Sequence, residues 1–189
     1  MEENKKFEHL LAFHCAPTLA GIKAASLVTV QKRKVGNFFA LLQQYQKCLN
    51  CKGIYFEVLS ETTNYVLVYV YRKNSLVEIL SAKENQELLQ AQGYKNTQDL
   101  EDCLSCLKAR LLLRKTFPHE IGLFLGYPLA DVQGFIENQG QKFKLSGSWK
   151  VYSDVDTARQ LFDSYARCSE KFCHSLNNGG MLEELTIAV

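Results

Sequence analysis

The segment HCAPTLAGIK places the imidazole of His14, the thiol of Cys15 and the ammonium group of Lys23 within one short stretch. A thiolate near a histidine can be a nucleophile or a ligand for a soft metal ion. Because a proline and a glycine interrupt the segment, we expect it to form a loop. Adjacent side chains of an extended chain point to opposite sides, so His14 is badly placed to activate Cys15, and His119 is the candidate base. The alternative is a structural loop that buries its cysteine.

A second imidazole and a carboxylate lie side by side in His119 and Glu120, after a proline and at the expected start of a short helix. His119 could bind a metal ion or transfer a proton. The favourable interaction of Glu120 with the helix dipole is a sufficient structural explanation for that residue. No second histidine follows at the spacing of the zinc proteases, so that class of site is absent.

Trp149 and Lys150 form a third candidate pair, on an expected strand, and Trp149 is the only tryptophan of the chain. An indole beside an ammonium group could stack on a planar ligand. The structural alternative is packing in the core or at its rim, which is common for a single tryptophan.

Two pairs of cysteines have the spacing of metal sites, Cys48 with Cys51 and Cys103 with Cys106. Four thiolates from two such pairs could hold a structural zinc ion. However, neither pair contains the glycine or proline of a zinc knuckle, and both lie in helical patterns. Cys103 falls on the apolar stripe of its helix, so we interpret it as a small buried hydrophobic residue.

The elements that position these residues belong to an ordinary globular chain of 189 residues, with 47% hydrophobic residues and a net charge of +2. This composition excludes disordered and collagen-like chains and predicts a single compact domain over residues 1–189. The amino-terminal segment is too charged for a signal peptide, and the longest apolar run, residues 65–71, is far shorter than the roughly 20 residues of a membrane helix. We therefore expect a cytoplasmic protein with reduced thiols and no membrane partner.

Hydrophobic periodicity predicts a mixed α+β fold, with a small, mostly antiparallel sheet and a central hairpin packed by several helices. Residues 54–60 and 65–72 are the hairpin strands, and the second is apolar on both faces, as in a central strand. A shorter strand pair is expected over residues 143–153 and a terminal strand over residues 185–189. Helices are expected over residues 5–13, 35–49, 75–82, 83–92, 97–114, 120–125, 128–139 and 154–176.

Residues 119–139 have the apolar and glycine spacing of a helix-turn-helix, and the strand pair after them would be its wing. The second helix contains Asp131 and Glu137 and neither lysine nor arginine, so it would repel phosphates. The nearly neutral chain also argues against a nucleic-acid partner. A protein-interaction module remains as an alternative for this segment.

The chain resembles a bacterial family of unknown function, DUF3793. The matching blocks are HCAPTLAGIK, FPHEIGLFLGYPLADVQGFIENQG and GSWKVY. The resemblance implies no reaction, substrate or cofactor, and both cysteine pairs lie outside its blocks. It implies that the family signature falls on the candidate residues already singled out, namely His14, Cys15, Lys23, His119, Glu120, Trp149 and Lys150.

We therefore expect these signature residues to line one pocket for a small ligand or a metal ion, with Cys15 and His119 as direct contacts. An enzyme with Cys15 as nucleophile and His119 as base is the first alternative. The second is the protein-interaction module. The sequence specifies neither the ligand or cofactor nor the oligomeric state.

Overall fold

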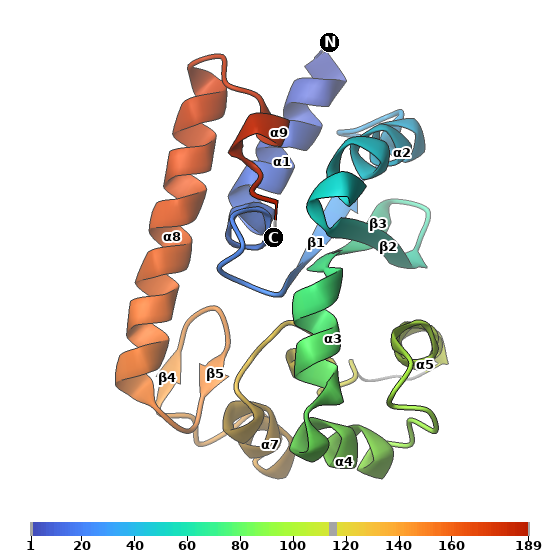
Figure 1. Cartoon of the computed structure of the whole chain (residues 1–189), viewed down its shortest axis with the longest axis vertical. Coiled ribbons are helices and arrows are strands. Elements are labelled where there is room, and N and C mark those ends of the chain that lie inside the picture. The colour runs from blue at the N-terminus through green and yellow to red at the C-terminus, as the bar shows by residue number, and fades with distance from the viewer. Residues whose placement is uncertain (1, 114–116, 189) are drawn as a thin grey trace. The chain divides into compact units, whose positions relative to one another are not determined.

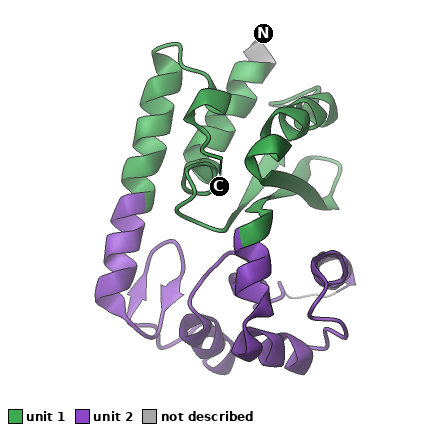
Figure 2. Ribbon diagram, viewed as in Figure 1, with its two compact units in different colours: residues 1–74, 165–189 green, residues 75–164 purple. Residues whose placement is uncertain are grey.

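The structure is a computed structural model that describes residues 2–113 and 117–188. The chain divides into two compact units, drawn in different colours in Figure 2. Unit 1 comprises residues 1–74 and 165–189, and unit 2 comprises residues 75–164. Helices predominate beside a small antiparallel sheet, so the predicted α+β class is confirmed.

Unit 1 is built on a three-stranded antiparallel sheet of β1 (Ala25–Gln31), β2 (Ile54–Glu61) and β3 (Tyr65–Arg72), in the order β1-β3-β2 (Figure 1). The two predicted strands are confirmed as β2 and β3. The central position predicted for β3 is also confirmed, and most of its side chains are buried on both faces. β1 was not predicted, because the region after the first helix was expected to be a loop.

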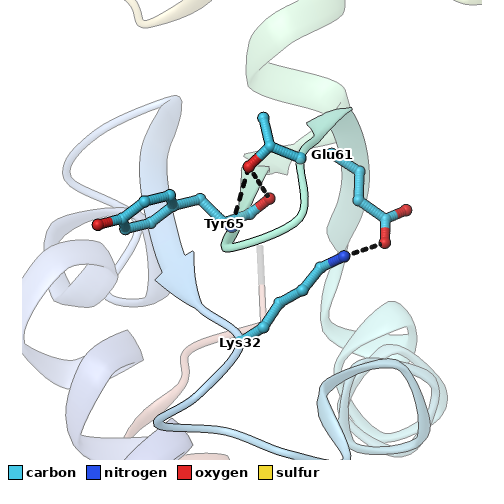
Figure 3. A network of polar contacts seen from close by, with 4 residues as sticks. Lys32, Glu61 and Tyr65 are labelled. Atoms are coloured by element: carbon cyan, nitrogen blue, oxygen red, sulfur yellow. Dashed lines mark hydrogen bonds and ion pairs between the residues drawn. The ribbon is translucent and has the colours of Figure 1, made fainter.

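The hairpin between β2 and β3 closes through a polar turn, as predicted (Figure 3). The hydroxyl of Thr62 accepts a hydrogen bond from the Tyr65 backbone N–H at 3.0 Å and donates one to the Tyr65 carbonyl at 3.2 Å. Lys32, just after β1, donates to the Glu61 carboxylate at 2.5 Å. These contacts are exposed or half-buried and fix the end of the hairpin with little effect on stability.

Helices α1 (Glu2–Leu19) and α2 (Phe38–Leu49) pack on the sheet, and the short α9 (Leu182–Leu185) packs on α1. A 3₁₀ turn, η1 (Asn50–Lys52), follows α2. Gly53, with φ +76°, ends this helical segment where the sequence predicted its end. The apolar core of unit 1 includes Phe7, Leu11, Val28, Phe38, Leu42, Val68 and Val70.

The predicted loop from His14 to Lys23 is wrong over its first half, because α1 continues through Pro17 to Leu19. A proline removes one helical hydrogen bond, but burial of the apolar face of this turn favours the helix. The guanidinium of Arg72 also stabilises this end of the helix, because it donates hydrogen bonds to the carbonyls of Thr18 and Leu19, both at 2.6 Å.

The predicted terminal strand is also wrong in the described residues, since α9 lies there and residues 186–188 pair with no strand. Backbone groups of Thr186 and Ile187 have other partners. The backbone N–H of Ile187 donates to the Leu19 carbonyl at 3.0 Å, and the ammonium group of Lys52 donates to the carbonyl of Thr186 at 2.8 Å. The predicted strand end at residue 189 lies outside the described residues.

Unit 2 begins within α3 (Lys73–Ser81), which is followed by α4 (Lys83–Ala91) and α5 (Leu100–Leu113). The predicted break near Lys83 is confirmed. Asp99 caps α5, with its carboxylate 2.9 Å from the backbone nitrogen of Asp102, so the predicted caps Asn96 and Thr97 are wrong by a few residues. The predicted helix end at residue 114 lies outside the described residues.

The rest of unit 2 contains the elements that build the candidate site. The short α6 (Ile121–Phe124) and α7 (Leu129–Glu137) form the helix-turn-helix-like segment. The hairpin of β4 (Leu145–Ser146) and β5 (Lys150–Val151) follows, as predicted. Asp154 then caps α8 (Val155–Asn177), whose first part belongs to unit 2 and whose second part belongs to unit 1. None of the helices described is both long enough and apolar enough to cross a bilayer.

Candidate ligand-binding site

Unit 2 contains a cavity of about 330 Å³. Its walls come from the segment around α6, from α7 and from the β4–β5 hairpin. These elements contain the second and third blocks of the family resemblance, residues 117–140 and 147–152, which are called the second and third signature blocks below; the first is residues 14–23. The described residues that line it are Phe117, His119, Ile121, Gly122, Tyr127, Asp131, Val132, Phe135, Ser146, Gly147, Trp149 and Lys150.

Asp131 on α7 holds the hairpin in place. Its carboxylate is buried and accepts hydrogen bonds from the Trp149 indole N–H at 2.7 Å and from the Tyr152 and Ser153 backbone N–H groups, both at 2.8 Å. The Ser153 hydroxyl donates a fourth, at 2.7 Å. Burial by itself raises the pKa of Asp131, but these donors lower it by more, so the pKa lies below its ordinary value. Asp131 is therefore an ionised anchor for the cavity wall.

The indole of Trp149 is fixed on several sides. Its ring stacks on Tyr127, with centroids 4.9 Å apart and an interplanar angle of 26°. The rings of Trp149 and Phe162 form a T-shaped contact, with centroids 4.6 Å apart and an interplanar angle of 81°. Gly147 lies so close to Phe162 that an added Cβ would be 2.2 Å from that ring. The aromatic wall is consequently packed against neighbouring rings on more than one side.

One edge of the cavity carries positive and hydrogen-bonding groups around the Phe135 ring. The ammonium group of Lys150 donates to the Gly140 carbonyl at 2.6 Å and lies 5.6 Å from the Phe135 centroid and 4.8 Å from the Phe143 centroid. The ring of His119 lies 4.9 Å from the same Phe135 centroid. His119 is exposed, and none of the residues described forms a hydrogen bond with its ring nitrogens. The cavity edge thus combines an ammonium group with an imidazole.

Glu120 does not line the cavity, although it follows His119. Its carboxylate is buried and pairs with the guanidinium of Arg110 on α5, and the Tyr94 hydroxyl donates to it at 3.2 Å. Burial first and then the charge of Glu120 raise the pKa of Tyr94. The sequence pattern did not reveal Arg110, whose donation to the Gln92 carbonyl at 2.5 Å completes a structural cluster.

The first signature block lies in unit 1 and contributes no lining residue to this cavity. Cys15 is fully buried on α1, and burial raises the pKa of its thiol to about 12, although the charge of Lys23 opposes this shift. The ammonium group of Lys23 lies 5.7 Å from the Tyr165 ring centroid. His14 is exposed, beside the ring of Phe13 at 4.9 Å. Of the predicted pocket residues, the cavity contains His119, Trp149 and Lys150.

The cysteine pairs are divided between the units, with Cys48 and Cys51 in unit 1 and Cys103 and Cys106 in unit 2. All are free thiols, and Cys103 is buried in the core, as its place on the apolar stripe predicted. Across residues 2–113 and 117–188, no three histidine, cysteine or acidic side chains are grouped so that they could hold a metal ion.

Asp131 was not predicted as a site residue, and its charge was interpreted only as repelling DNA. The available signal was its position beside Val132, on the face of α7 that also bears Phe135. A carboxylate on such a face requires buried donors, but the sequence does not identify which residues supply them.

Comparison with known proteins identifies the family of this chain but no individual relative. No curated protein and no solved structure is significantly similar to the chain. The model of a family described as "Protein of unknown function (DUF3793)" matches residues 11–186, a span that includes every described residue of the cavity. The chain therefore belongs to the DUF3793 family.

Proposed function

We propose that this protein binds a small, flat organic molecule in the cavity of unit 2. The observation that carries the proposal is a cavity of about 330 Å³ walled by aromatic rings, with an ammonium group and an imidazole at one edge. Pockets for small molecules combine apolar walls with a few polar groups in this way, and their volumes begin at about 300 Å³. The size suits one aromatic ring or a fused pair.

The fixed walls support binding rather than simple packing. Trp149 is held by the Asp131 carboxylate and by two neighbouring rings, so it loses little freedom when a ligand enters. A wall that is ordered beforehand lowers the entropic cost of association. A flat ligand would replace water against the apolar side chains and gain contact area without a change in the fold.

An organic ligand is favoured over a metal ion in this cavity. Its described lining offers one imidazole, from His119, and one carboxylate, from Asp131. That carboxylate already accepts four hydrogen bonds, so it is a poor ligand for a cation. Metal sites in proteins need three or more such groups directed at one point.

The properties of Cys15 argue against the thiol enzyme. A cysteine nucleophile needs access to substrate and a lowered pKa. Cys15 is fully buried, and burial raises its pKa to about 12. The cytoplasmic location stays a prediction from the sequence.

The experiment uses the single tryptophan, whose indole N–H gives one isolated cross-peak in a ¹H–¹⁵N NMR spectrum. We expect flat aromatic compounds, screened individually at up to about 1 mM, to include some that shift this cross-peak. Ser146→Phe should abolish the shifts, because Ser146 lines the cavity and the larger side chain would fill it. Ser148→Phe is the matched control, since Ser148 is an exposed residue of the same turn outside the lining.

Two results would contradict the proposal. One is a screen in which no compound shifts the indole cross-peak. The other is equal binding by the two serine variants, which would locate the bound compound elsewhere.

A further inference from the structure

The charged groups of the cavity decide which ligands it accepts. Among the described lining residues, three are of acidic or basic type, namely His119, Asp131 and Lys150. Their environments differ, and this difference gives the cavity a definite polarity.

The negative charge of Asp131 is not available to a ligand. Asp131 is 2% exposed, and all four hydrogen bonds of its carboxylate come from the indole, the backbone and the hydroxyl of the hairpin segment. A carboxylate surrounded by donors is stabilised where it is and has little capacity left to attract a cation. Among the described lining residues, no carboxylate is therefore left to pair with a cationic ligand.

The ammonium group of Lys150 still has capacity to donate. It carries three N–H donors and uses one of them on the Gly140 carbonyl at 2.6 Å. It is half-buried, so its charge is less screened than that of a surface lysine. Its position beside the Phe135 and Phe143 rings restricts it to the cavity edge.

His119 lies against the same ring as Lys150, at 4.9 Å from the Phe135 centroid compared with 5.6 Å for the ammonium group. An imidazole donates a hydrogen bond from one ring nitrogen even when it is neutral. Because His119 and Lys150 both line the cavity, a negative group of a ligand near Phe135 has two kinds of donor available to it, while an attached ring enters the aromatic walls.

From this arrangement we infer that the ligand is a flat aromatic carboxylate, with its carboxylate bound by Lys150 and His119 and its ring lying against the aromatic walls. The inference rests on the proposed function and adds the charge of the ligand. One ammonium group and one imidazole suit a monoanion better than a doubly charged phosphate, which recruits more donors.

A series of three compounds with one ring system tests the charge directly. The probes are 2-naphthoate, 2-naphthamide and 2-naphthylmethylammonium, which are negative, neutral and positive. Dissociation constants are measured from the Trp149 indole cross-peak and by calorimetry. We expect 2-naphthoate to bind about tenfold more tightly than the amide, as for a hydrogen bond to a charged group, and the ammonium compound to bind most weakly.

Variants of Lys150 then test whether this side chain produces the preference for the carboxylate. Lys150→Met should reduce the preference for the carboxylate over the amide to about twofold or less, and Lys150→Arg should restore most of it. Lys144→Met is the control, because Lys144 lies on the same hairpin, is exposed and does not line the cavity. The wild-type series does not depend on how well any variant folds.

The outcomes separate the two proposals. Equal binding of 2-naphthoate and 2-naphthamide, or tighter binding of the ammonium compound, would overturn the carboxylate inference and leave the ligand-binding function standing. A preference that survives Lys150→Met would also overturn it. If no compound in the series or in the wider aromatic screen shifts the indole cross-peak, the ligand-binding function fails and the inference fails with it.

Discussion

At the scale of single residues, Asp131 links the second and third signature blocks. Its carboxylate receives four hydrogen bonds from Trp149, Tyr152 and Ser153. Asp131→Asn replaces one acceptor oxygen by a donor NH₂ group that faces other donors. We expect the free energy of unfolding to fall by about 1–3 kcal/mol, measured by urea denaturation.

Asp163→Asn is the matched control for this substitution. Asp163 is an exposed residue of α8 in the same unit, and its variant should differ from wild type by about 0.5 kcal/mol or less. If the two asparagine variants were equally stable, the hydrogen bonds of Asp131 would make no measurable contribution to the free energy of unfolding.

The contribution of Asp131 to stability should depend on pH in one direction. Because its folded pKa lies below the ordinary value of 3.8, the charged network stabilises the fold fully above about pH 3.8. The stabilisation is lost as the pH falls through the folded pKa. The difference in unfolding free energy between wild type and Asp131→Asn should therefore be constant near pH 5–6 and shrink below pH 3.8. A difference that stayed constant down to pH 3 would contradict this prediction.

At the scale of elements, α7 packs against the segment after β5 through Gly134. An added Cβ there would lie 2.5 and 2.6 Å from Cγ and Cβ of Tyr152. These atoms lie close to the backbone and cannot move aside cheaply. Gly→Ala in a helix normally stabilises by about 1 kcal/mol, whereas overpacking costs about 1–3 kcal/mol, so we expect Gly134→Ala to lower the melting temperature.

Gln133→Ala is the comparison for this variant, because Gln133 is the exposed neighbour on the same helix. It should leave the melting temperature unchanged or slightly higher. An increase in both variants would show that helix propensity outweighs the contact between Gly134 and Tyr152.

The end of α1 depends on a side chain from β3. Arg72 is 3% exposed and donates to the carbonyls of Thr18, Leu19 and Ile187, at 2.6, 2.6 and 2.8 Å. Arg72→Met keeps much of the volume but leaves these acceptors without the guanidinium. We expect a loss of about 2–3 kcal/mol in unfolding free energy, and a smaller loss in Arg72→Lys, which retains a charge and fewer directed donors.

Lys73→Met, which changes the exposed neighbour of Arg72, should have little effect. Hydrogen exchange of the amides near residues 18–22 gives a local readout. Unchanged protection in Arg72→Met would show that the end of α1 does not need the guanidinium.

At the scale of the whole molecule, the prediction of a single domain requires that units 1 and 2 unfold in one cooperative transition. Cys15 in unit 1 and Cys103 in unit 2 are both buried, and burial raises the pKa of their thiols to about 12 and about 11. Neither should react with a thiol reagent until its own unit opens. If the chain unfolds as one domain, pulsed labelling across a urea gradient should modify both cysteines at the same midpoint.

Mass spectrometry of the labelled peptides distinguishes the two sites. Cys51 is exposed and should react without urea, which provides the internal control for the reagent. Separate midpoints for Cys15 and Cys103 would show two domains that unfold independently, contrary to the single-domain prediction.

Elements with strong local patterns could be predicted from the sequence, and those stabilised by distant partners could not. The alternating and continuous apolar runs of β2 and β3 identified both strands and the central place of β3. The extension of α1 past Pro17 depends on Arg72, which lies 54 residues away from Thr18 in the chain. The candidate residues His119, Trp149 and Lys150 were recognisable by type, whereas the role of Asp131 was not.

The sequence by itself determined the α+β class, most helices and strands, and the unusual side chains of the signature blocks, because these follow from local periodicity and residue type. Only the tertiary structure decided that Cys15 is a buried thiol, that Glu120 pairs with Arg110, and that Asp131 anchors the cavity wall. The physical reason is that burial of a polar group is tolerated only when distant segments supply its partners. Local pattern specifies which face of an element is buried, but it does not specify which donors and acceptors meet there.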